Sequence, residues 1–216
     1  MRDKPGNLAY LWAIMKRARP YDRDTALDAA VNLFWIKGYH ATSLKDLESA
    51  LHMKPGSIYA AFSSKEALYL AALERYFEMS RKGFASHMQG AESPLAALSE
   101  YLLQLARSRS EDHQGRACML VKTLIDTTAT DTDIADRANH YIEEIQADFA
   151  AAFDRAKAIG ELPQELDSRR LARRYQSNIN ALRLELHRGM EQADLTALAE
   201  DMVEDLERLR VAPANA

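Results

Sequence analysis

Apolar residues recur at intervals of three and four positions along most of this chain, which is the period of an amphipathic helix. No stretch alternates apolar and polar residues with a period of two, so the pattern predicts no β-sheet. We expect an all-α fold of about nine helices, with a three-helix head followed by a six-helix body. The expected helices lie at about 22–37, 42–51, 55–62, 65–89, 94–109, 116–127, 133–159, 167–187 and 194–210.

Residues 42–68 carry the most informative local pattern in the chain. Thr42 and Ser43 are residue types that cap helix N-termini, and Asp46 occupies the acidic position of a capping box. Pro55 fits the first turn of a following helix, where its missing N–H costs nothing. Two short helices joined in this way form a helix-turn-helix, whose second helix can enter the major groove of DNA.

Many spaced residues of this region match one family pattern. They are Thr42-Ser43, Asp46-Leu47, Gly56-Ser57-Ile58-Tyr59, Phe62 and Ser64-Lys65-Glu66-Ala67-Leu68, with Ala29-Ala30, Leu33-Phe34 and Gly38-Tyr39 upstream. On these residues the chain resembles the TetR family of bacterial transcriptional regulators over about residues 22–70. Two positions depart from the family: His52 replaces a usual turn glycine, and Lys54 replaces a frequent Ser or Thr cap. Histidine adopts positive φ less readily than glycine, and a lost cap costs about 1 kcal/mol.

The resemblance implies a ligand-responsive transcriptional repressor that binds a near-palindromic double-stranded DNA operator as a homodimer. It implies a helix-turn-helix DNA-binding domain at 15–63 and a ligand-binding and dimerisation domain at 64–212. In this family the last two long helices pair the subunits, so we expect the leucine stripes of 171–186 and 195–209 at the interface. Three alternatives remain: a TetR-type activator, a thiol-based sensor of electrophiles or oxidants, and a helical small-molecule-binding protein or enzyme without DNA binding.

The candidate DNA-binding residues lie in and beside the helix-turn-helix. They are Thr42, Ser43, Lys45, Lys54, Gly56, Ser57, Tyr59 and Lys65. Lysine and serine side chains reach base edges or phosphates, and a glycine lets the backbone approach closely. By the resemblance, Thr42, Tyr59 and Lys65 match positions that usually bind phosphate. The alternative is an ordinary solvated helix surface.

The candidate residues for a small-molecule effector are mostly apolar and come from the body. They are Tyr76, Met79, Leu102, Leu105, Cys118, Phe149, Tyr175 and Asn178. Ligand cavities are typically apolar with a few polar anchors, and here Tyr175 and Asn178 are the expected anchors. The alternative is that several of these side chains simply fill the core.

Cys118 is the single cysteine of the chain, so no disulfide forms within it. It stands at an expected helix start, where the helix dipole favours a reactive thiolate. Because a free cysteine is more often a small buried hydrophobe, packing is the simpler interpretation. A single cysteine fits the reducing cytosol, and we expect a cytoplasmic protein.

Charge is distributed unevenly, although the chain as a whole carries −4. Residues 1–63 carry +3 and residues 64–216 carry −7, which suits DNA contact at one end only. If translation starts at Met15 rather than Met1, residues 16–19 form a basic N-terminal arm. No nucleophile elbow, glycine-rich phosphate loop or metal-ligand spacing is present, and no apolar run approaches a membrane span. We therefore expect no enzyme, metal, cofactor or membrane partner.

Overall fold

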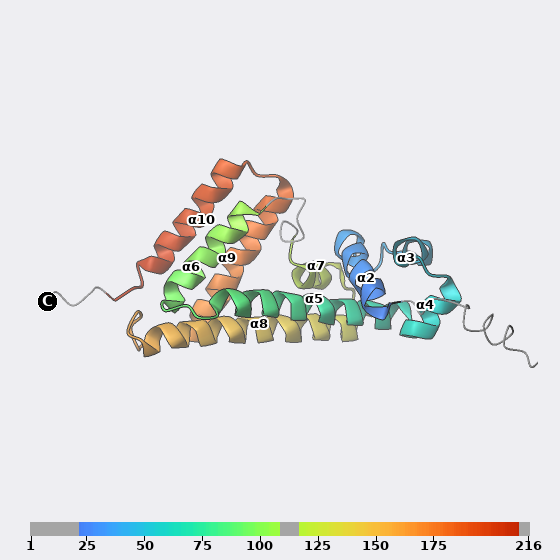
Figure 1. Cartoon of the computed structure of the whole chain (residues 1–216), viewed down its shortest axis with the longest axis horizontal. Coiled ribbons are helices and arrows are strands. Elements are labelled where there is room, and N and C mark those ends of the chain that lie inside the picture. The colour runs from blue at the N-terminus through green and yellow to red at the C-terminus, as the bar shows by residue number, and fades with distance from the viewer. Residues whose placement is uncertain (1–21, 109–116, 212–216) are drawn as a thin grey trace, which may run out of the picture.

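The structure, a computed structural model, describes residues 22–108 and 117–211. Every regular element within these residues is an α-helix, which confirms the all-α class, and nine helices are described (Figure 1). Their bounds are α2 Arg23–Lys37, α3 Leu44–Leu51, α4 Pro55–Phe62, α5 Lys65–Met88, α6 Pro94–Arg107, α7 Met119–Asp126, α8 Thr132–Ala158, α9 Ser168–Arg188 and α10 Gln192–Glu207.

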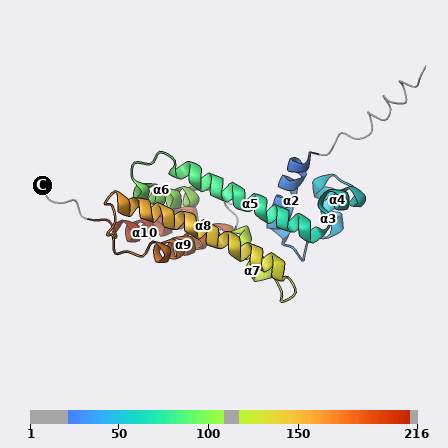
Figure 2. The ribbon, with the colours of Figure 1, turned by 90° about the horizontal axis from the view of Figure 1, so that it is seen from below.

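Two long helices, α5 and α8, run side by side and organise the molecule (Figures 1 and 2). Helices α2, α3 and α4 gather at one end of α5 and form the head. Helices α6, α9 and α10 gather around the other end, and α7 lies between the two groups. With 24 residues at 1.5 Å per residue, α5 is about 36 Å long. A single continuous helix therefore joins the head to the body.

The two helices of the helix-turn-helix begin where the capping pattern predicts. Ser43 Oγ accepts the Asp46 N–H at 3.2 Å, and Asp46 Oδ2 accepts the Ser43 N–H at 2.9 Å. His52 ends α3 with φ of 53°, in the left-handed region that glycine usually occupies in this family. Pro55 opens α4, and Lys54 before it makes no side-chain capping bond. The structure thus shows a left-handed backbone at His52 and an uncapped helix start at Lys54, the two positions that depart from the family pattern.

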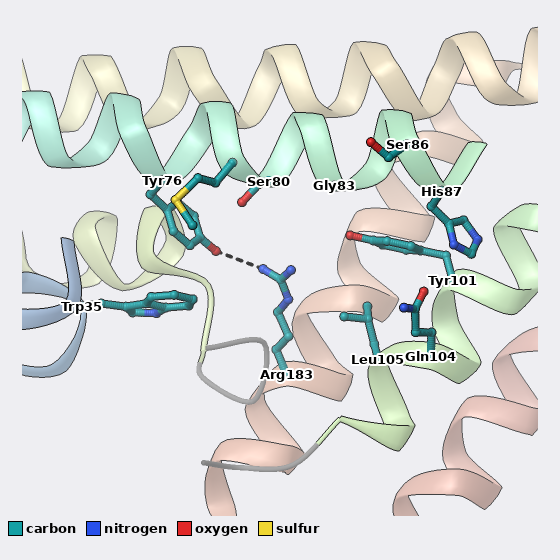
Figure 3. A pocket seen from close by; sticks show the side chains of 11 residues that line it. Trp35, Tyr76, Ser80, Gly83, Ser86, His87, Tyr101, Gln104, Leu105 and Arg183 are labelled. Carbon is teal, nitrogen blue, oxygen red and sulfur yellow. Dashed lines mark hydrogen bonds between the residues drawn. The ribbon is translucent and has the colours of Figure 1, made fainter. Parts of the chain in front are cut away.

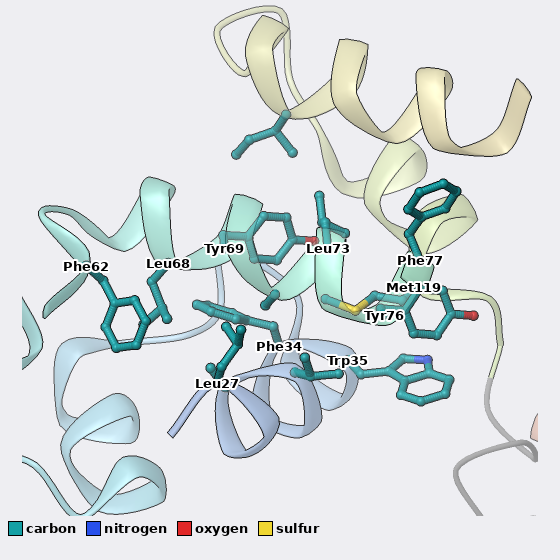
Figure 4. Close-up of a cluster of buried hydrophobic side chains, with 14 of the residues drawn as sticks. Leu27, Phe34, Trp35, Phe62, Leu68, Tyr69, Leu73, Tyr76, Phe77 and Met119 are labelled. Atoms are coloured by element: carbon teal, nitrogen blue, oxygen red, sulfur yellow. The ribbon is translucent and has the colours of Figure 1, made fainter. Parts of the chain in front are cut away.

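The head is held by apolar side chains from α2, α4 and α5 (Figure 4). Phe34 and Phe62 are buried in this core, at 1% and 5% exposure, so their rings are not available to stack on bases. The rings of Phe34 and Tyr69 meet edge to face, with centroids 4.8 Å apart. Ile58 is 1% exposed, so the inner side of α4 is fixed against this core.

This core continues beyond the head. Met119 and Leu120 of α7 and Tyr141 of α8 belong to the same buried cluster as the head residues. The division into domains at 15–63 and 64–212 stays an interpretation, and residues 15–21 lie outside the described part. The head and α7 therefore share one continuous core of packed side chains.

The leucine stripes of α9 and α10 correct one expectation. Leu182 and Leu206 are 1% and 7% exposed within a single subunit, where they pack in a second cluster with α6 and α8. A stripe at helical spacing marks a buried face but does not say what buries it. The expectation that Leu182 and Leu206 lie at a dimer interface is wrong, because the subunit's own body covers them.

Several helix ends can be compared with the expectations. Helix α9, expected from about 167, is capped by Asp167, which accepts the N–H groups of Arg169 and Arg170. Helix α10, expected from about 194, begins two residues earlier at Gln192, after Glu191. The expected boundaries at 109 and 116 and the basic segment at 16–19 lie outside the described residues. None of the described helices is both long and apolar enough to cross a membrane.

Candidate DNA-binding and effector sites

Helix α4 presents a polar outer face opposite its buried side. Lys54, Gly56 and Ser57 are exposed, and the Tyr59 ring is 44% exposed. A side chain at Gly56 would meet no atom within 4 Å, so the surface there is open. An exposed α4 with a lysine, a serine and a tyrosine can offer donors to phosphates and base edges.

Two of the other candidates are engaged within the head. Thr42 is 1% exposed, and its hydroxyl donates to the Gly38 carbonyl oxygen at 2.6 Å. Its side chain therefore closes the turn after α2, which corrects the expectation that it reaches a phosphate. The Ser43 hydroxyl donates to Asp46 Oδ2 at 2.8 Å within the capping box, although the residue is exposed. Lys45 is exposed on α3.

Lys65 is held at the first residue of α5. Its Nζ lies 4.7 Å from the centroid of the Tyr39 ring, a cation–π contact. Partial burial lowers the pKa of the Lys65 ammonium. The free N–H groups of a helix start attract anions, so this cation and the start of α5 favour the same kind of partner.

The body contains a cavity of about 480 Å³ between α5, α6 and α9. This volume is in the range of small-molecule sites. Three of the expected effector residues, Tyr76, Met79 and Leu105, line it (Figure 3). The other lining residues are Trp35, Ser80, Gly83, Ser86, His87, Tyr101, Gln104 and Arg183.

The remaining expected effector residues lie elsewhere. Cys118 and Phe149 border a separate space of about 30 Å³ beside the cavity. Leu102, Tyr175 and Asn178 border a space of about 10 Å³ that faces α10. The Tyr175 hydroxyl already donates to a backbone carbonyl, that of Leu98, at 2.7 Å. The expectation that Tyr175 and Asn178 anchor a ligand in the main cavity is therefore wrong.

Two residues of the cavity wall were not expected there. Arg183, on α9, donates from its Nη1 to the Tyr76 hydroxyl at 3.0 Å in the cavity wall. Trp35 comes from α2 in the head, and its indole N–H donates to the Ala117 carbonyl at 2.7 Å. No sequence signal separates Arg183 from its neighbouring arginines on α9. The cavity thus includes a side chain of the DNA-binding head.

Cys118 is 6% exposed, as the packing interpretation expects. Its Sγ lies 3.6 Å from the hydroxyl oxygen of Tyr76, which donates to it. Burial raises the pKa of the Tyr76 phenol, so this group stays neutral. In the described part of the chain, no group of three or more His, Cys, Asp or Glu residues is arranged to hold a metal ion.

Comparison with known proteins identifies the family. A model of "Bacterial regulatory proteins, tetR family" matches residues 26–72. The HTH-type transcriptional repressor ComR of Escherichia coli (strain K12) is 30% identical over 188 residues, which are 85% of this chain and 89% of ComR. The HTH-type transcriptional repressor BdcR of the same strain is 29% identical over 135 residues, covering 62% of this chain and 68% of BdcR.

Solved structures agree with the sequence relatives. A cysteine mutant of the TetR family regulator CifR, complexed with a 26 bp double-strand operator DNA, is similar with a TM-score of 0.79 and 29% identity. The similarity covers 87% of this chain and 98% of CifR. Reduced NemR of E. coli has the same fold, with a TM-score of 0.75 at 17% identity over 89% of this chain and 98% of NemR.

The chain belongs to the TetR family of bacterial regulatory proteins. It is a helix-turn-helix transcriptional regulator and not an enzyme, which confirms the resemblance seen in residues 22–70.

Proposed function

We propose that this regulator is a repressor that binds a near-palindromic DNA operator as a homodimer in the cytoplasm and releases it when a small molecule occupies the body. The observation that carries the proposal is the exposed polar face of α4, held rigidly from behind by Ile58 and Phe62. The similarity to the DNA complex of CifR supports the same use of the head.

The proposed contacts divide into two kinds. Lys54 and Ser57 of α4 would face the major groove and read bases, while Tyr59 and Lys65 would bind phosphates. Lys45 would add a phosphate contact from α3. Phosphate contacts fix the position of the protein on DNA but do not distinguish sequences, so the two kinds can be separated by mutation.

The link between effector and DNA is proposed to run through the end of α2. Trp35 on the cavity wall belongs to α2, and Lys122 of α7 donates to the carbonyl oxygens of Trp35 and Ile36 at 3.0 and 2.7 Å. A bound molecule would favour one arrangement of α2 and α7, and hence one separation of the two heads of a dimer. Such an effector acts only through its different affinity for the two arrangements.

The proposed dimer uses the outer surfaces of α9 and α10. Leu184 of α9 is 50% exposed, and Met202 and Val203 of α10 are partly exposed. These side chains replace Leu182 and Leu206 as interface candidates, because each keeps apolar surface exposed, Leu184 most of all, while Met202 and Val203 also pack against the core of their own subunit. An isologous contact would bury them against the same surface of the second subunit.

The DNA proposal is tested by selecting duplexes from a random pool with the full chain. The wild type should enrich a near-palindromic sequence. Lys65→Ala should weaken binding to all sequences and lower the slope of log affinity against log salt by about one. Lys82→Ala, which removes an exposed lysine of the body, is the matched control and should change neither. A pool without enrichment, or an equal effect of both variants, would refute the proposed interface.

A further inference from the structure

Arg183 is a cation in the cavity wall with no acidic partner among the described residues. Its guanidinium projects from α9 toward α5 and faces Tyr76 (Figure 3). Nη1 donates to the Tyr76 hydroxyl at 3.0 Å, whereas Nε is shielded from solvent and has no hydrogen-bond partner. No carboxylate of the described chain lies within ion-pair distance of Arg183.

The neighbours of Arg183 do not compensate its charge. Burial raises the pKa of Tyr76, so the phenol is a neutral partner. Asp148 borders the adjoining small space, but its two oxygens accept from Nε and Nη2 of Arg81 at 2.6 and 2.8 Å. An arginine stays charged at any physiological pH. Among the described residues, the Arg183 charge in the cavity wall therefore has no carboxylate partner.

An uncompensated charge away from water is costly, and the cost falls when an anion binds beside it. A carboxylate is well suited because the planar guanidinium donates to two oxygens at once. The described lining of the main cavity contains no Asp or Glu that would repel such a group. Trp35, Met79 and Leu105, from three different helices, supply apolar surface to the lining of the same cavity. The site thus combines one fixed positive charge with room for an apolar body.

We propose that the effector of this regulator is an organic acid, whose carboxylate binds Arg183 and whose apolar part fills the cavity toward Trp35 and Leu105. The inference rests on the proposed function, since it names the chemical class of the molecule that controls DNA release. It concerns the class of ligand alone, so it can fail while the regulator still binds an operator.

The test compares acids with their amides, which have nearly the same shape but no charge. Octanoate, 3-phenylpropionate and benzoate are each titrated into the full chain by calorimetry beside octanamide, 3-phenylpropanamide and benzamide. We expect at least one acid to bind at least about tenfold more tightly than its amide, or about 1.4 kcal/mol. If no acid of the panel is preferred over its amide, the inference is overturned.

Two pairs of variants locate the effect. Arg183→Met removes the charge and keeps an unbranched apolar chain, so the preference for the acid should vanish. Arg173→Gln removes an exposed arginine of the same helix and should keep the preference. Gly83→Leu adds bulk where a Cβ meets no atom within 4 Å on the cavity wall, so it should weaken acid and amide alike. Gly83→Ala is its control and should bind both as the wild type does.

Measurements of thermal stability and of operator release distinguish a failure of the organic-acid proposal from a failure of the proposed function. Arg183→Met should melt no lower than the wild type, because the partly buried Arg183 has no carboxylate partner among the described residues and its replacement breaks no ion pair there. A preference for acids that survives in Arg183→Met overturns the assignment. Release of a selected operator by neutral compounds but by no acid would overturn the inference and leave the proposed function intact. Failure to select any operator would instead remove the proposed function.

Discussion

Lys122 forms one of the contacts between the DNA-binding head and the body, and this contact can be tested directly. Its Nζ donates to the carbonyl oxygens of Trp35 and Ile36, at 3.0 and 2.7 Å, in the last turn of α2. A positive charge at the C-terminal end of a helix also interacts favourably with the helix dipole. Lys122→Met keeps most of the side-chain stem and removes both hydrogen bonds.

The expected loss of stability in Lys122→Met follows from the two hydrogen bonds that the ammonium makes. A hydrogen bond to a charged group contributes about 1.5–3 kcal/mol, but Lys122 is only partly buried and water can replace some of the loss. We therefore expect Lys122→Met to lower the free energy of unfolding by about 1–3 kcal/mol. Lys122→Arg, which keeps a cation at the same place, should recover part of the difference.

Two measurements check this expectation. Urea denaturation gives the change in stability, with Lys82→Met as the control for removing an exposed lysine from the body. Hydrogen exchange then shows whether the backbone N–H groups in the last turn of α2 exchange faster in Lys122→Met. Equal stability of the two variants, together with unchanged exchange in α2, would show that Lys122 does not tie the head to the body.

Three further predictions concern the cap of α3, the thiol and the dimer. The Lys37 ammonium holds the pKa of the Asp46 carboxyl below its ordinary 3.8. The ionised Asp46 therefore stabilises the folded state fully above pH 3.8, and this contribution is lost as the pH falls toward the lowered pKa. Asp46→Asn should therefore lower the melting temperature more at pH 7 than near pH 2, as followed by circular dichroism. If the buried Cys118 thiol only packs in the core, N-ethylmaleimide or hypochlorite should release operator DNA equally from the wild type and from Cys118→Ser. Release from the wild type alone would establish a thiol sensor. Leu184→Glu should give a monomer by light scattering, and a dimer of unchanged mass would exclude this surface of α9.

The parts of the structure that follow from local chemistry were predictable from the sequence. The capping box of Ser43 and Asp46 and the cap at Asp167 involve residues no more than three positions apart, so their types and spacing suffice. Position 52 was predictable in the same way, because the turn needs a positive φ and His52 adopts it. Thr42 was misjudged because its hydroxyl bonds to Gly38, a contact that depends on how the chain turns after α2.

The cavity was less predictable because it depends on contacts between distant segments. Its wall combines Trp35 with Tyr76 and Arg183, and the last two are 107 residues apart. Periodicity shows that one face of α9 is buried, but it does not show which arginine at the edge of that face meets α5. The same limit applies to Leu182, since a stripe of leucines looks alike whether it packs inside one subunit or between two.

The position of Trp35 explains how a small molecule could act on DNA over a short path. The indole forms part of the cavity wall, while the backbone of the same residue accepts from Lys122 at the end of α2. A ligand that contacts the indole therefore touches the head itself and needs no relay along the whole of α5. Because Phe34, the preceding residue, packs against Tyr69 in the head core, a shift of this turn also displaces packed side chains. Packed cores move between discrete arrangements rather than deforming smoothly, so under the proposed function a ligand that displaces Trp35 would favour one orientation of the head over another.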